Sequence, residues 1–192
     1  MHRNDLHALH VRALRLVGDA EKFANTNHRG QVRKYTGEPY VTHCRAVAKL
    51  VEAADCGNEA IAAAWLHDTV EDCEGVTMKT INDRFGPIVA DYVHYLTDPE
   101  CPPEWNRQAR KSYQAGRLAG APAVVQSIKL ADLIHNTSSI VVYDPNFARI
   151  YLDEKFFLWQ KCLTRGNALL RAMAEMQLRE GMKYLDDRKQ GS

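Results

Sequence analysis

The chain has 192 residues, and its 25 Lys and Arg side chains nearly balance its 24 Asp and Glu side chains, which leaves a formal net charge of +1. A hydrophobic content of 45% and a charged content of 26% are typical of a folded globular protein, and they exclude wholesale disorder and fibrous architecture. The near-zero net charge argues against a general nucleic-acid-binding protein.

The sequence predicts neither a membrane span nor a secretory signal. Apolar runs such as residues 61–66 are far shorter than the roughly 18 residues that a membrane span needs. The segment at residues 1–5 lacks the apolar stretch of a signal peptide. The five cysteines are odd in number and form no C-x-x-C pair, which disfavours both disulfides and a zinc–thiolate site. We therefore expect a cytoplasmic protein with free thiols.

Apolar residues recur at helical spacing nearly throughout the chain, and no stretch alternates as a β-strand does. The predicted elements, in chain order, are a helix at residues 5–25, a loop at 28–40, a helix capped by Thr42, a buried helix at 58 to about 70, a short helix from Thr77 to Gly86, a helix that Pro87 opens, a basic helix at 104 to about 118, a helix after residues 120–122, a turn at 143–146, and one or two helices at 147 to about 185. This pattern predicts an all-α protein, an irregular bundle of about seven to nine helices.

Candidate chemistry gathers on a few polar residues inside apolar segments. His67 and Asp68 follow an apolar helical run, and on a continuous helix Glu71 and Asp72 would lie one turn further along the same edge. Asp132 lies among apolar neighbours in the same way. An unpaired buried charge costs several kcal/mol, and a divalent cation offers one common solution, because imidazole nitrogens and carboxylate oxygens are ligands of Mn, Fe and Zn. We therefore consider His43 together with these residues as a candidate metal site.

Each of these features has an ordinary interpretation when it is taken alone. An H-D dipeptide is common, and Glu71-Asp72 alone would usually be the solvated end of a helix. Several awkward placements that a single cation would resolve favour the metal site.

Longer motifs resemble a known family. Residues 28–43 (HRGQVRKYTGEPYVTH), 64–72 (AWLHDTVED) and 129–136 (KLADLIHN) are similar to the hydrolase motifs of RelA/SpoT-type alarmone enzymes, which belong to the HD-domain metal-dependent phosphohydrolases. The resemblance spans roughly residues 20–165 in the family's order. It suggests a stand-alone small alarmone hydrolase, with residues 1–192 as a single HD-type domain.

The resemblance implies one Mn²⁺ per chain, held by His43, His67, Asp68 and Asp132, and removal of pyrophosphate from the 3′ position of (p)ppGpp. Such a cation acts as a Lewis acid on phosphoryl oxygens. Glu71 and the neighbouring Asp72 would take the proton of the attacking water and orient that water for attack.

Substrate contacts are implied in the same way by family similarity. The expected substrate-binding residues are Arg33 and Lys34 at the purine base and nearby phosphates, Arg107 at the 5′ phosphates, and Asn136 at the ribose or a phosphate.

The sequence departs from the family at two positions and leaves alternatives open. Leu133 stands where many members have Arg, and Cys44 stands where Pro is common. Adenosine alarmones, (p)ppApp, are an alternative substrate, and an HD-type nucleotide 5′-phosphohydrolase is an alternative enzyme. A metal-binding sensor or antitoxin module is a third possibility, against which the intact Glu71-Asp72 pair argues. We expect a small nucleotide as the partner, with no nucleic acid and no membrane; the sequence does not predict the oligomeric state.

Overall fold

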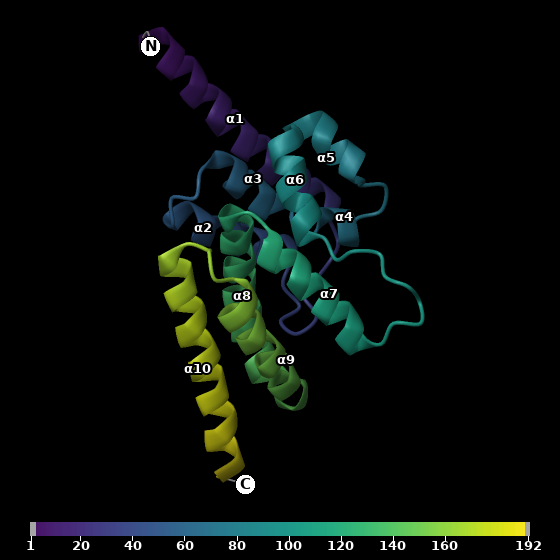
Figure 1. Ribbon diagram of the computed structural model, residues 1–192. Coiled ribbons are helices and arrows are strands. Elements are labelled where there is room, and N and C mark those ends of the chain that lie inside the picture. The colour runs from purple at the N-terminus through teal and green to yellow at the C-terminus, as the bar shows by residue number, and fades with distance from the viewer. Residues whose placement is uncertain (1–2, 191–192) are drawn as a thin grey trace. The chain divides into compact units, whose positions relative to one another are not determined.

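The computed structural model describes the backbone of residues 3–190 and the side chains of residue 11 and residues 14–189. The described residues are helical apart from connecting turns, and their only β pairing is an isolated bridge between Val32 and Pro39. Nine α-helices are eight residues or longer, so the all-α prediction and its helix number are confirmed (Figure 1). In the described part of the chain, no helix has both the length and the apolar character that crossing a membrane requires.

Chain contacts divide the molecule into two compact units. The first unit contains residues 1–32 and 38–97, and the second contains residues 33–37 and 98–192. The helices of the first unit are α1 (Arg3–Asn27), α2 (Val41–Ala53), α3 (Asn58–Leu66), α4 (Thr69–Asp72), α5 (Met78–Phe85) and α6 (Pro87–Leu96). The short α3 contacts α1, α2 and α6 and is buried along nearly its whole length, as its apolar sequence predicts. It forms the centre of this unit.

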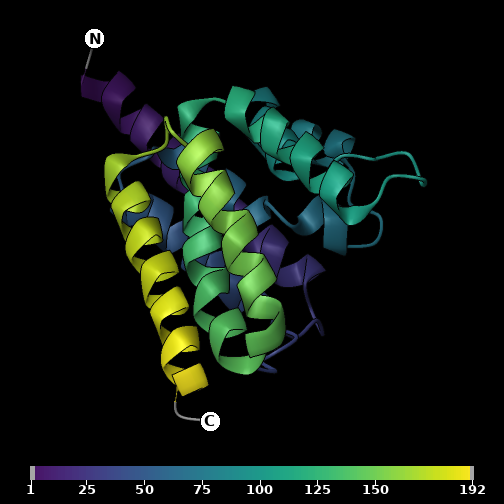
Figure 2. The same cartoon turned by 60° about the horizontal axis from the view of Figure 1, so that its bottom comes forward.

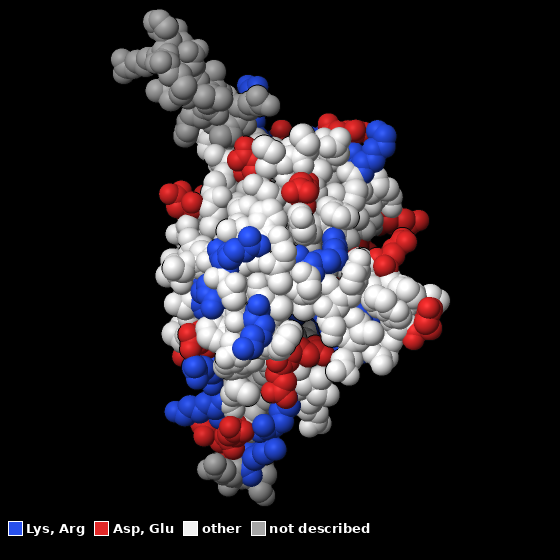
Figure 3. Space-filling model, viewed as in Figure 1, with Lys and Arg blue, Asp and Glu red and all other residues white. Residues whose placement is uncertain are grey.

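The second unit is built from longer helices. These are α7 (Arg107–Gly120), α8 (Ala123–Tyr143), α9 (Pro145–Phe157) and α10 (Ala168–Gln190), with a π-helical turn, η1 (Leu158–Cys162), between the last two. Helices α8, α9 and α10 pack against one another, and they lie side by side in both views (Figures 1 and 2). Basic and acidic side chains intermingle over the C-terminal half of α10, so the visible face of this helix carries no field of one sign (Figure 3).

Local capping signals account for several helix ends. Thr77 and Thr80 form a reciprocal capping box at the start of α5, and Gly86, with φ +87°, separates α5 from Pro87 at the start of α6, as predicted. The basic helix begins at Arg107 rather than at residue 104, because the Asn106 side chain accepts a hydrogen bond from the Ala109 amide at 2.9 Å.

Two further sequence predictions about helix ends are wrong. Thr42 does not cap α2, because the helix begins at Val41 and the Thr42 hydroxyl donates back to the Pro39 carbonyl at 2.8 Å. The helix predicted at residues 58–70 ends at Leu66, since Thr69 Oγ1 donates to the Leu66 carbonyl at 2.7 Å and so satisfies one of the last carbonyls of α3. His67 and Asp68 therefore lie in the turn between α3 and α4.

Candidate active site

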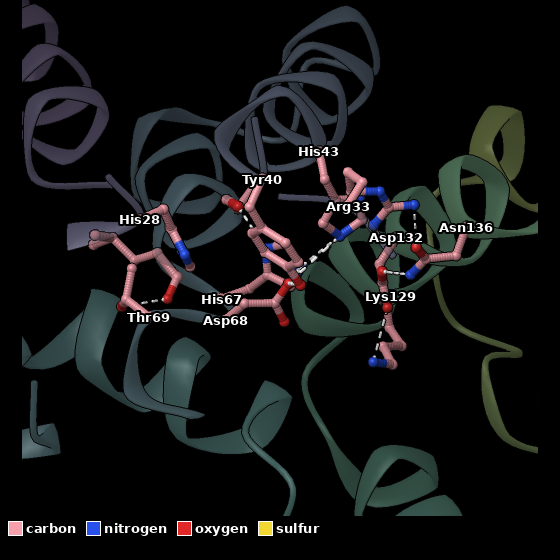
Figure 4. A network of polar contacts seen from close by, with 12 residues as sticks. His28, Arg33, Tyr40, His43, His67, Asp68, Thr69, Lys129, Asp132 and Asn136 are labelled. Carbon is pink, nitrogen blue, oxygen red and sulfur yellow. Dashed lines mark hydrogen bonds and ion pairs between the residues drawn. The ribbon is translucent and has the colours of Figure 1, made fainter. Parts of the chain in front are cut away.

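Three predicted metal ligands come together in the first unit. His43, on α2, and His67 and Asp68, in the turn after α3, each direct one ligand atom into a common space (Figure 4). His43 Nε2 lies 3.2 Å from His67 Nε2 and 3.5 Å from Asp68 Oδ2, and His67 Nε2 lies 3.0 Å from the same oxygen. Both imidazoles are almost fully buried. The α3–α4 turn therefore brings its two side chains to the histidine of a different helix.

The tautomer of His67 follows from its backbone partner. His67 Nδ1 lies 2.8 Å from the Ala64 carbonyl, which can only accept a hydrogen bond, so Nδ1 carries the proton. Nε2 faces Asp68 and His43, and it is the nitrogen that would offer its lone pair to a bound cation. A histidine held through its other nitrogen in this way is the usual arrangement of a metal-ligating imidazole.

The spacing of the three ligand atoms fits a divalent cation. Ligands about 2.1 Å from a metal ion are separated from one another by roughly 3.0 to 3.4 Å in octahedral or tetrahedral geometry. The observed separations of 3.0 to 3.5 Å match that range. Two nitrogen atoms and one carboxylate oxygen are suitable ligands for Mn, Fe or Zn. The cluster is a candidate divalent-metal centre, as predicted.

Tyr40 is a contributor to this centre that the sequence analysis did not single out. Its hydroxyl donates to Asp68 Oδ2 at 2.7 Å, and its ring packs on the edge of His43. Burial and the Asp68 charge raise the pKa of Tyr40 far above its usual range, so the phenol stays a donor. Burial alone would raise the pKa of Asp68, but the His67 and His43 imidazoles outweigh it and hold that pKa well below its usual range. The position of Tyr40, three residues before His43, is the sequence signal that could have identified it.

Glu71 and Asp72, the predicted acid–base pair, lie in the same unit on the single-turn helix α4. Both side chains are exposed, whereas Thr69 on the same turn is buried. The Asp72 amide donates to the Asp68 carbonyl at 2.9 Å, so the pair still lies one helical turn beyond the ligand turn, despite the break after Leu66. Desolvation and the nearby Asp68 charge raise the pKa of Asp72.

The fourth predicted ligand, Asp132, belongs to the second unit and lies on α8. It is buried, and its two oxygens accept from Lys129 Nζ at 2.9 Å and from Asn136 Nδ2 at 2.6 Å (Figure 4). Asn136 in turn accepts from Arg33 Nη2 at 2.9 Å, and the same guanidinium nitrogen lies 3.3 Å from Ser139 Oγ. A continuous chain of hydrogen bonds therefore links two predicted substrate-binding residues to a predicted metal ligand.

The other two predicted substrate-binding residues also lie in the second unit. Lys34 is exposed and lies over the Tyr35 ring, 4.8 Å from its centroid. Arg107, the first residue of α7, forms a forked ion pair with Glu154, with nitrogen–oxygen distances of 3.0 and 2.8 Å.

A pocket of about 570 Å³ lies within the second unit, between α7, α8 and α9. Its size is in the range of small-molecule sites. Its charged lining side chains are Asp98, Arg107, Lys111, Lys129, Glu154 and Lys155. Burial, with further contributions from Lys129 and Lys111, lowers the pKa of Lys155 to about 8. Four basic groups against two acidic ones favour an anionic ligand.

The two departures from the family motif are both core residues here. Leu133 is 1% exposed, and it fills the interior of the second unit. Cys44 is fully buried in the first unit, where burial raises the pKa of its thiol, so it stays neutral beside the metal centre. Neither residue presents a polar group to a substrate.

Comparison with known proteins identifies the family. A sequence family described as "HD domain" matches residues 20–160. The chain belongs to the HD-domain family. The Drosophila melanogaster protein named guanosine-3′,5′-bis(diphosphate) 3′-pyrophosphohydrolase MESH1 is 31% identical over 162 residues, which cover 83% of this chain and 88% of that protein. Its namesake from Danio rerio is 30% identical, with 82% of this chain and 87% of that protein covered.

A solved structure supports the same assignment for this HD-domain protein. The structure, described as a metazoan ortholog of SpoT that hydrolyzes ppGpp, matches with a TM-score of 0.75 and 26% sequence identity. The match covers 86% of this chain and 94% of that one. These relatives confirm the resemblance to RelA/SpoT-type hydrolases on which the functional expectations were based.

Proposed function

We propose that this HD-domain protein is an alarmone 3′-pyrophosphohydrolase that converts (p)ppGpp and water to GDP or GTP and pyrophosphate, and so acts in stringent-response control. The observation that carries the proposal is the His43–His67–Asp68 cluster with a carboxylate pair one turn away. Relatives of nearly equal length bear the name of this activity. A divalent cation can polarise a phosphoryl oxygen, and a carboxylate can take the proton of an attacking water, so the cluster and the pair together suit phosphoester hydrolysis.

Under this proposal, His43, His67, Asp68 and Asp132 hold one Mn²⁺ per chain. A bound divalent cation supplies Lewis-acid chemistry at a phosphoryl oxygen. The Asp132 assignment is supported by its burial among apolar residues of α8, where an anion needs positive partners. Lys129 already donates to one of its oxygens. Residues 1–192 would then act as one catalytic domain.

The protein's own groups carry the proton transfers and the orientation of substrate. Glu71 and Asp72 accept the proton of the attacking water and orient it toward the phosphorus of the 3′-pyrophosphate. The water oxygen forms a bond to that phosphorus as the bond from phosphorus to the 3′ oxygen breaks. The proton taken from the water is returned to the 3′ oxygen, so that the nucleotide leaves with a 3′ hydroxyl and pyrophosphate is released. Tyr40 keeps Asp68 in one orientation through its hydroxyl, which lies 2.7 Å from Oδ2.

Substrate recognition is assigned to the second unit. Arg33 offers a planar face to a purine base, and Lys34 and Arg107 offer positive charge to phosphates. Asn136 lies between Arg33 and Asp132, with its amide engaged on both sides. We extend its role from substrate contact to the alignment of these two groups. A cytoplasmic location agrees with the five cysteines, none of which forms a disulfide.

The test is to identify the product released from three substrates. The Mn²⁺-loaded protein is incubated with ppGpp, ppApp and dAMP, and the products are separated by ion-exchange chromatography. Pyrophosphate from ppGpp is the expected result. If only ppApp releases pyrophosphate, the substrate is an adenosine alarmone. If dAMP releases orthophosphate, the protein is a nucleotide 5′-phosphohydrolase. If none of the three gives a product, the protein is a metal-binding module without this activity.

A matched pair of variants shows whether the activity belongs to this site. Asp68→Asn should abolish hydrolysis, because it removes a charged ligand of the proposed cation. Asp83→Asn makes the same chemical change at an exposed ion pair with Lys79 in the same unit, and it should retain wild-type turnover.

A further inference from the structure

Glu71 and Asp72 lie on a single-turn helix whose C-terminal end is capped by a side chain from outside the helix. Helix α4 has only four residues, and the backbone leaves the helical conformation at Cys73, which is extended. The Asp72 carbonyl accepts instead from Gln31 Nε2 at 2.6 Å, a side chain 41 residues earlier in the sequence. A side chain from the loop after α1 therefore caps the turn that carries Glu71 and Asp72.

The amide of Gln31 has only one orientation that satisfies its surroundings. Nε2 must face the Asp72 carbonyl, since turning the amide over would bring two oxygens together. Oε1 then lies 2.6 Å from His28 Nδ1, which must donate. His28 is 2% exposed, and its ring packs on Tyr40 with centroids 4.9 Å apart. Burial of the Cys73 thiol beside these groups raises its pKa to about 11, so it places no charge among them.

The same loop also contacts the metal centre. The Tyr40 amide donates to the Gln31 carbonyl at 2.9 Å, so the two residues are adjacent across the Val32–Pro39 bridge. Gln31 reaches the Asp72 carbonyl, and Tyr40 reaches Asp68 Oδ2 at 2.7 Å. One short segment thus contacts both the proposed proton acceptors and a proposed ligand.

We propose that Gln31, oriented by His28, is a positioning residue that sets the placement of Glu71 and Asp72 relative to the metal centre through the Asp72 carbonyl. This inference rests on the proposed hydrolytic function of the site. Gln31 touches neither the metal ligands nor the reacting atoms in this role. It acts through the backbone of α4, and a displacement of about 1 Å in a catalytic group is enough to slow a reaction strongly.

The experiment compares Gln31→Leu with the wild-type protein. Leu fills a similar volume but forms neither hydrogen bond, so kcat for ppGpp should fall about 10-fold, while KM and Mn²⁺ affinity change by less than about 2-fold. Gln31→Glu, which cannot donate to the Asp72 carbonyl, should give the same result if the leucine variant folds poorly. Unchanged kcat, or a loss of Mn²⁺ affinity, would overturn the proposal.

A double-mutant cycle distinguishes positioning from general destabilisation. In a Glu71→Gln background, Gln31→Leu should lower kcat by less than about 2-fold, because residues that act as a unit are not additive. Multiplicative effects would overturn the proposal. Thr77→Ala is the matched control, since it also removes a helix cap in the first unit but caps α5, away from the site, and it should leave kcat unchanged.

Amide hydrogen exchange tests the inference without relying on activity. The amides of Asp72 and Cys73 donate to the carbonyls of Asp68 and Thr69 in this turn. Their exchange should therefore accelerate in Gln31→Leu and stay at the wild-type rate in Thr77→Ala. Unchanged exchange would overturn the positioning role even if kcat fell. A wild-type protein that does not hydrolyse ppGpp would refute the proposed function, whereas the exchange result would still report on the contact itself.

Discussion

Single hydrogen bonds determine which atoms of the candidate site can bind a cation. The Ala64 carbonyl fixes the proton of His67 on Nδ1, and the Tyr40 hydroxyl occupies one side of Asp68 Oδ2. The Ala64 carbonyl and the Tyr40 hydroxyl both belong to the first unit, so His67 and Asp68 are oriented before a cation binds. Such preorganisation lowers the cost of assembling a metal centre.

Glu71→Gln separates proton transfer from metal binding. Gln keeps the size and hydrogen bonding of the side chain but cannot accept a proton, so turnover should fall by about 10²-fold or more with Mn²⁺ binding retained. Steady-state kinetics and Mn²⁺ titration measure the two effects. Glu74→Gln, at an exposed position three residues later, is the control and should be neutral. Near wild-type turnover at saturating ppGpp would exclude Glu71 as the base.

Arg33→Lys tests the proposed purine contact. Lys keeps the positive charge but loses the planar face and the forked donors, so KM should rise about 5-fold, corresponding to about 1 kcal/mol, with a smaller change in kcat. The exposed Arg29→Lys change in the same loop should have no effect. Stacking does not distinguish guanine from adenine, so ppGpp and ppApp should be affected alike. An unchanged KM for both substrates would contradict the contact.

Among the elements, the break between α3 and α4 matters most for the site. A continuous helix would have placed His67 and Asp68 on its side, whereas the turn presents both beside His43. The sequence analysis missed the break because no glycine or proline marks it. The hydrogen bonds of Thr69 and His67 to α3 carbonyls end the helix instead.

Gly86→Ala tests the junction between α5 and α6. Gly86 has φ +87° and ψ 169°, a conformation that is essentially restricted to glycine, and a Cβ there would meet no atom within 4 Å. The expected loss of stability, about 1 to 3 kcal/mol, is therefore a backbone effect alone. Urea unfolding measures it. Gly116→Ala, in the middle of α7 where a Cβ is equally unobstructed, should stabilise the protein by about 0.5 to 1 kcal/mol.

At the scale of the whole molecule, Mn²⁺ binding at the proposed metal centre should affect the stability of the chain. A cation that binds only the assembled site stabilises the folded chain, by about 2.7 kcal/mol at a hundredfold excess over Kd. Mn²⁺ should therefore raise the Tm of the wild-type protein. Asp132→Ala should lose that increase together with activity, whereas the exposed Asp153→Ala on α9 should keep both. Full Mn²⁺ affinity in Asp132→Ala would remove this residue from the ligand set.

Lys155 makes the stability of the chain depend on pH. Its folded pKa of about 8 lies below the usual lysine value of about 10.4, so between these values the unfolded chain binds more protons and stability rises with pH. Lys155→Met should therefore be more stable than the wild type at pH 7, and the difference should narrow as the pH rises to 10. Urea unfolding at several pH values measures it, with the exposed Lys161→Met as control. A difference that does not vary with pH would contradict the lowered pKa.

Features that depend on residues close together in the sequence, such as helices and their caps, could be predicted from the sequence alone. Apolar periodicity predicts the helices, and Thr77, Gly86 and Pro87 mark their ends correctly, because caps depend on residues three or four positions away. Residue chemistry likewise pointed to His43, His67 and Asp68 as a cluster. The single domain, the metal-ligand roles of His43, His67, Asp68 and Asp132, the acid–base roles of Glu71 and Asp72, and the substrate contacts remain predictions.

Contacts between distant residues were decided only by tertiary structure. Gln31 reaches Asp72 across 41 positions, Tyr40 reaches Asp68 across 28, and Arg33 reaches Asn136 across 103. Nothing in the local pattern encodes these pairs, since each depends on the path by which packing returns the chain to the site. Helical periodicity reports which face of a segment is buried, but not which polar groups meet there, and that arrangement determines how the candidate site is held.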